Sequence, residues 1–142
     1  MMGKRGGLIL AGWLAAGAAG AAELTFTVMA ANLSGSDFEY DESADRVFQG
    51  LKPDIVAIQE WTVAGGDRRA FVDRNFGKDF FFCVENEPRD KVPNGVISRW
   101  PILSAGTWDD PQVPDRGFAW ARIDLPHVTN DLYVVSVHLH SS

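Results

Sequence analysis

The stretch "PDIVAIQE" (53–60) constrains the fold of this chain more than any other segment. It is a short, continuous apolar run that follows a proline and ends on the carboxylate Glu60. An uninterrupted apolar run of this length predicts a strand that is covered on both faces, rather than one with a face in water. The chain is therefore expected to pack in layers, with this strand inside.

The segments around this strand predict a mixed α/β domain. Runs rich in β-formers and separated by turn residues predict strands at 24–32, 54–60, 79–85, 95–99, 102–108, 117–125 and 131–139. Apolar residues at helical spacing predict a helix over 44–51, and a second helix is expected over 67–76, ended by Gly77. The order is strand, helix, strand, helix and then several strands. This order predicts a layered α/β fold and not a purely parallel βαβ array.

The first 22 residues have the layout of a secretory signal peptide. Lys4 and Arg5 precede "LILAGWLAAGAAG", an apolar run that is short for a membrane span, and small residues lead to Glu23. Cleavage is expected after Ala22, and an uncleaved N-terminal anchor is the alternative. The alanine and glycine content suggests a bacterial signal. We therefore expect a secreted or periplasmic protein with one domain, 23–142, and no transmembrane segment after cleavage.

The charge of the mature part limits the partners that it can bind. Removing residues 1–22 leaves 11 basic against 19 acidic residues, a formal charge of −8 instead of −6. Such a chain is not expected to present the broad basic face that binds nucleic acid through its phosphates. The single cysteine, Cys83, excludes an intramolecular disulfide, and its place in "FFFCVE" predicts a small buried apolar side chain.

Polar residues follow two of the predicted strands where each strand ends. Glu60 comes directly after the buried run, at the edge where open α/β sheets place their ligands. A carboxylate there suits a hard cation such as Mg²⁺, which prefers oxygen ligands, although a solvated glutamate fits the same pattern. Asn32 ends the first strand, where it either orients a catalytic group or turns the chain.

The last strand carries two histidines, His138 and His140, which share one face because they are two residues apart. One interpretation is a zinc site, but the next position of such a pattern is Ser142, and His127 lies in a loop. Another is that one histidine acts on a phosphoryl group while the other is incidental. The third interpretation is that both histidines are solvated side chains at an exposed strand end. Arg116 precedes the strand at 117–125, where it either binds phosphate or is solvated.

Four segments in order resemble the endonuclease/exonuclease/phosphatase superfamily, whose members include deoxyribonuclease I-like, exonuclease III-like and sphingomyelinase-like proteins. They are "FTVMAAN", "LKPDIVAIQE", "NGVISRWPI" and "DLYVVSVHL", and together they extend over the whole mature chain. The second is the most distinctive, since it is similar to the family's wording around its metal-binding glutamate.

The resemblance implies a four-layer α/β sandwich that hydrolyses phosphoesters with a divalent metal, Mg²⁺ or else Mn²⁺ or Ca²⁺. Glu60 would hold the metal, Asn32 would support the metal–phosphate cluster, and His138 would stabilise the transition state. Arg116 would bind the substrate phosphate, with Asn94 as a further substrate-binding residue; Glu85 is a weaker candidate for the cleft. The substrate class, whether nucleic acid, phospholipid or small phosphoester, is left open. No stable protein partner is implied.

The chain also departs from the family pattern. In the family, an aspartate–x–asparagine motif and a late aspartate–histidine pair follow the histidine-bearing strand, and no counterpart follows the predicted strand at 131–139 in these 142 residues. We therefore expect the N-terminal portion of the family's domain, with little activity by itself and with apolar strand edges exposed. The alternatives are a non-catalytic secreted binding domain that keeps the fold, and a zinc hydrolase that uses His138 and His140.

Overall fold

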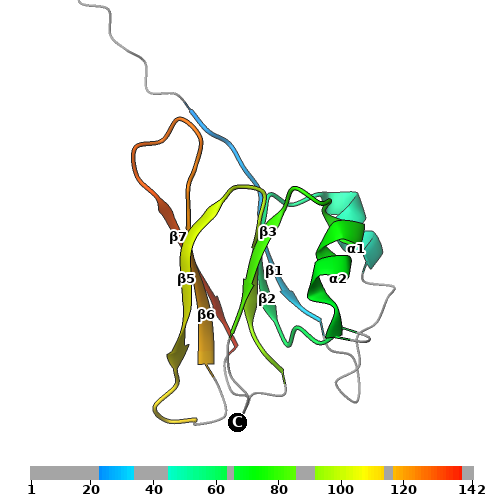
Figure 1. Cartoon of the computed structure of the whole chain (residues 1–142), viewed down its shortest axis with the longest axis vertical. Helices are drawn as coiled ribbons and strands as arrows, with labels where there is room; N and C mark the ends of the chain where they lie inside the picture. Colours follow the sequence, from blue (N-terminus) through cyan, green and yellow to red (C-terminus); the bar gives the residue numbers. More distant parts are fainter. Residues whose placement is uncertain (1–22, 34–44, 64–65, 86–91, 114–116, 139–142) are drawn as a thin grey trace, which may run out of the picture.

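The computed structural model describes residues 23–33, 45–63, 66–85, 92–113 and 117–138. Within these residues two β-sheets pack face to face, and two helices cover the outer face of the first sheet (Figure 1). The strand order is β1-β2-β4-β3 in the first sheet and β5-β6-β7 in the second. The predicted mixed α/β fold is therefore confirmed, and the described part forms three layers.

The first sheet is built around the strand that the sequence placed inside. Its strands are β1 (Val28–Asn32), β2 (Ile55–Gln59), β3 (Phe81–Val84) and β4 (Gly95–Ser98). The helices that cover it are α1 (Asp45–Leu51) and α2 (Arg68–Asn75). Strand β2 pairs in parallel with β1 and antiparallel with β4, and β4 pairs antiparallel with β3. Ile55, Val56 and Ile58 are fully buried, as expected of a strand covered on both faces.

The second sheet is an antiparallel meander of β5 (Ile102–Asp109), β6 (Gly117–Ile123) and β7 (Leu132–Val137). Side chains of β6 alternate between a buried and a half-buried environment. Its buried residues Ala119, Ala121 and Ile123 face the first sheet, because successive side chains point to opposite faces. The second sheet therefore contributes one of its faces to the core.

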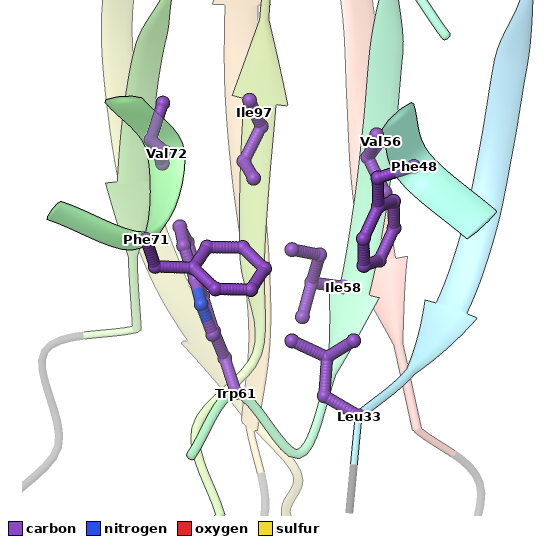
Figure 2. Close-up of a cluster of buried hydrophobic side chains, with 8 residues drawn as sticks. All are labelled: Leu33, Phe48, Val56, Ile58, Trp61, Phe71, Val72 and Ile97. Carbon is purple, nitrogen blue, oxygen red and sulfur yellow. The ribbon is translucent and has the colours of Figure 1, made fainter. Parts of the chain in front are cut away.

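Two hydrophobic clusters hold the layers together. One lies between the helices and the first sheet, where Phe48 of α1 and Phe71 of α2 pack over β2 and β4 beside Trp61 (Figure 2). The other lies between the sheets and contains Ile55, Val96, Ala121, Ile123 and Leu125. The aromatic rings of the first cluster meet edge-on or tilted, with Trp61 and Phe71 centroids 5.8 Å apart.

The first strand begins later than its sequence suggests. The prediction placed it at 24–32, whereas β1 spans Val28–Asn32. Leu24 and Phe26 pack against the cluster between the sheets, and the Phe26 ring meets Trp100 edge-on. Their alternation therefore reflects packing between two layers rather than pairing in a sheet.

Several apolar side chains at the sheet edges and on the outer face of the second sheet are exposed. Val28 on edge strand β1 is 58% exposed, and Phe81 on edge strand β3 is 43% exposed. Trp108, Trp120 and Tyr133 stack in a row across the second sheet. Exposed apolar strand edges were expected from the sequence.

None of the described helices is long and apolar enough to cross a membrane. The predicted signal peptide, 1–22, lies outside the described residues.

Cys83 on β3 packs partly buried against the cluster between the sheets. Burial raises the pKa of its thiol to about 11, so the thiol stays protonated at neutral pH. The side chain therefore behaves as the small apolar group that its sequence context predicted.

Asp54 ties the start of β2 to the segment before β1. Its Oδ2 accepts hydrogen bonds from the backbone N and the Oγ1 of Thr27, at 2.9 and 3.1 Å, and its Oδ1 lies 3.1 Å from Nη1 of Arg99. Burial alone would raise the pKa of Asp54, but the hydrogen bonds from Thr27 and Arg99 outweigh burial and lower it. The folded protein therefore favours the ionised carboxylate.

Replacing Asp54 by asparagine is expected to lower the free energy of unfolding by about 1 kcal/mol at pH 7. Because the folded-state pKa lies below the unfolded value, this stabilisation is complete above the unfolded pKa and disappears as the pH falls through the folded pKa. Urea denaturation of both proteins at pH 7 and at about pH 2.5 measures the difference. An equal loss at both pH values, or an equal loss in the exposed control Asp124→Asn, would contradict this account.

Candidate active site

Glu60 follows β2 and leaves the strand through a left-handed backbone conformation, with φ of 51°. Non-glycine residues rarely adopt this region, and such strain often occurs at functional sites. A hydrogen bond from Thr62 N to Glu60 O, 2.7 Å long, closes the turn. The side chain is 10% exposed, so its carboxylate is held largely inside the protein.

His138 follows β7 of the second sheet and meets Glu60 of the first. The distance from His138 Nε2 to Glu60 Oε1 is 3.3 Å, and the imidazole side chain is 19% exposed. A carboxylate in this position accepts from the ring nitrogen and orients the imidazole. Two residues that are 78 positions apart in the chain thus form one carboxylate–imidazole pair.

A hydrogen-bonded link beside this pair fixes the two sheets relative to each other. Ser136 Oγ, fully buried, donates to Ile58 O at 2.5 Å and accepts from Gln59 Nε2 at 3.1 Å. Ser136 shares a face of β7 with His138, and Ile58 and Gln59 directly precede Glu60. The link therefore sets the distance between the ends of β2 and β7 where the pair forms.

Asn32 lies at the same end of the first sheet. It is in register with Gln59 across the parallel pair β1–β2, and Leu33 N donates to Gln59 O at 3.0 Å. Neighbouring strands are about 4.8 Å apart, so Asn32 lies one strand away from the residue before Glu60. The structure thus brings the three predicted residues Asn32, Glu60 and His138 to one end of the two sheets.

Asn94 lies inside the protein, fully buried at the start of β4. Its Nδ2 donates to Glu85 Oε2 at 3.0 Å and to Gly117 O at 2.7 Å, and its backbone N also donates to Glu85 Oε2. These bonds join the ends of β3, β4 and β6 from both sheets. The contacts that the structure shows for Asn94 are with the protein itself, and substrate binding by this residue stays a prediction.

Two of the predicted residues, Arg116 and His140, lie outside the described residues. His127 lies in the turn before β7, whereas His138 follows that strand, so the two histidines are at opposite ends of β7. The parts of the chain that the structure describes contain no group of three or more His, Cys, Asp or Glu side chains that could hold a metal. The zinc alternative therefore stays a prediction.

The donor set at this edge fits a hard cation with few protein ligands. In the Glu60 carboxylate, Oε1 contacts His138, and Oε2 is outside this contact. Asn32, on the neighbouring strand, carries an amide oxygen in its side chain. Mg²⁺ commonly takes one or two carboxylates from the protein and keeps several waters, so it does not require a cluster of three. Glu60 would be the ligand, and Asn32 would support it.

Arg68, the first residue of α2, is a further polar residue near Glu60 in the chain and is not among those that the sequence indicates. Its guanidinium donates to Trp61 O, one residue after Glu60, through Nε at 3.3 Å and Nη2 at 3.1 Å. Burial lowers the pKa of Arg68, although an arginine stays charged at neutral pH. No spacing pattern indicates this contact, because an arginine in the first turn of a helix is typical of a solvated surface.

Comparison of the chain with protein-family models, with curated proteins and with solved structures found no match.

Proposed function

We propose that this protein is an exported phosphoester hydrolase, or part of one, that depends on Mg²⁺ or a similar divalent cation. The observation that carries the proposal is the Glu60–His138 contact of 3.3 Å, made between two sheets at the strand ends where Asn32 also lies. These are the three residues to which the family resemblance assigns metal and catalytic roles. Their meeting supports a shared site.

Each residue has a role in this proposal. Glu60 holds the metal and orients the imidazole of His138. His138 donates a hydrogen bond or a proton to a phosphoryl oxygen, where negative charge develops during displacement. Asn32 supports the metal ligand, and Arg116 binds the phosphate. A bound divalent cation would offset the negative charge on the phosphoryl oxygens.

The proposal includes the four-layer sandwich of the deoxyribonuclease I type. Two sheets packed face to face, with helices on the outer side of one, are consistent with this architecture. The stacked row of Trp108, Trp120 and Tyr133, in which Trp108 and Tyr133 are exposed, supports a further layer over the second sheet, since exposed apolar patches can mark a covered or binding surface.

Metal binding tests the proposal directly, without requiring turnover. Mn²⁺ added in small amounts to ¹⁵N-labelled protein should first broaden the backbone signals of Asn32, Glu60 and His138, and excess Mg²⁺ should restore them. Broadening that is confined to other acidic segments, such as the turn at Asp109 and Asp110, would contradict the proposed site. Absence of any binding would favour the alternative of a secreted binding domain without catalytic function.

A further inference from the structure

Among the described residues, Arg68 is the half-buried arginine for which the structure gives no carboxylate contact. Four arginines pair with aspartates: Arg69–Asp73, Arg74–Asp45, Arg99–Asp54 and Arg122–Asp131. Arg46 is exposed on α1. Arg68 is half-buried, and the structure gives it hydrogen bonds to the Trp61 carbonyl and a position over the Trp61 ring, 5.9 Å from the centroid.

The guanidinium of Arg68 is held in place by hydrogen bonds that involve only some of its N–H donors. Trp61 O accepts from Nε and Nη2, while the structure shows no described partner for Nη1. Trp61 is fully buried, and Trp61 N donates to Pro93 O at 2.7 Å, so the anchoring carbonyl is itself fixed. A guanidinium fixed on one side presents its remaining N–H groups in a rigid fork, the geometry that suits a phosphate.

The position of this cation relative to the candidate site is also set by the chain. Trp61 directly follows Glu60, so the carbonyl that anchors Arg68 belongs to the residue next to the carboxylate. A partly desolvated positive charge without a counter-ion is costly, and an incoming anion would offset this cost. In a chain with a formal charge of −6, anion binding requires such a local cation.

We propose that Arg68 binds an oxyanion, the phosphate group of a substrate or product, at the rim of the Glu60–His138 pair. The identification of this anion as phosphate rests on the proposed function, whereas the anion site itself rests on the geometry of Arg68. The residue adds a phosphate contact that complements the predicted contact at Arg116.

The test is a titration of the protein with inorganic phosphate, without metal, followed by NMR of the arginine side-chain Nε–H signals. The Arg68 signal should shift in a saturable way. In Arg68→Gln the affinity should fall about tenfold, the effect of losing one or two charge-assisted hydrogen bonds. Arg68→Lys, which keeps the charge but not the fork, should lose about threefold. A second titration with dimethyl phosphate distinguishes a diester substrate from free phosphate.

The matched control is Arg46→Gln, which removes the same charge from an exposed position on α1. Residue 46 is next to Asp45, which pairs with Arg74 in the last turn of α2, whereas Arg68 begins that helix. Phosphate binding should be unchanged in this control. An equal loss in Arg46→Gln, or a wild-type titration in which the Arg68 signal does not move, would overturn the proposal even if Arg68→Gln failed to fold.

The same titration on Glu60→Gln separates this inference from the proposed function. Phosphate binding that persists in Glu60→Gln would support an anion site that does not depend on the metal ligand. If the wild-type protein binds phosphate at Arg68 but binds no divalent metal, the anion site stands and the metal-dependent hydrolase is refuted. Metal binding at Glu60 without phosphate binding at Arg68 would refute the anion site and leave the metal-dependent hydrolase in place.

Discussion

Replacing Glu60 by glutamine is expected to weaken Mg²⁺ binding by at least about 100-fold, because loss of a mere outer-shell partner of a metal already costs 10- to 100-fold. The amide keeps the shape of the side chain and removes its charge, so the fold should be retained. Isothermal titration with Mg²⁺ and Mn²⁺ measures the change. Any Mg²⁺-dependent hydrolysis of a model phosphodiester such as bis(p-nitrophenyl) phosphate should fall to background in the same variant.

The matched control is Glu23→Gln, the same substitution at an exposed glutamate at the start of the described chain. It should leave metal affinity unchanged. His138→Ala should keep metal binding within a few-fold and lose hydrolysis, because His138 acts on the phosphoryl group and not on the cation. Metal affinity that is retained in Glu60→Gln would contradict the role of Glu60 as ligand. Glu60 would then remain only as the carboxylate that orients His138.

The sequence predicts the elements of this fold because the patterns are local. The run 54–60 has a continuous apolar centre at 55–58 and becomes a strand buried on both faces. The strand at 117–125 alternates and becomes β6 with one buried face. The same patterns place Asn32 and Glu60 at strand ends. The parallel pairing of β1 and β2 then brings these two ends to one edge.

The sequence does not predict which strand of the second sheet lies over β2. That depends on packing between the sheets and on the bonds of Ser136 to Ile58 and Gln59, which join residues 77 or 78 positions apart. The pairing of Glu60 with His138 follows from this placement. The burial of Asn94 depends in the same way on Glu85, which follows β3, and on Gly117, which begins β6.

Replacing Gly95 by alanine is expected to lower the free energy of unfolding by about 3 kcal/mol, at the upper end of what overpacking costs. A Cβ at this position would lie 2.3 Å from Cε3 of Trp61 and 2.8 Å from the backbone oxygen of Cys83. Gly95 is on the central strand β4, in register with Ile58 on one side and Val84 on the other. The backbone oxygen cannot move without disturbing this pairing, so the strain cannot be relieved by a side-chain rotation. Urea denaturation at pH 7 measures the loss.

The control is Gly50→Ala in α1, where an added Cβ meets nothing within 4 Å. This change should raise stability by about 0.5–1 kcal/mol, because alanine favours a helix over glycine. A Gly95→Ala protein with wild-type stability would contradict this prediction, because it would show that the packing of β3, β4 and Trp61 has space for the added methyl group. The loss at Gly95 also has a functional consequence, because the tryptophan that it would displace follows Glu60 and anchors Arg68. In the fraction of Gly95→Ala that still folds, we therefore expect weaker phosphate binding than in Gly50→Ala, as the carbonyl that holds the guanidinium moves with Trp61.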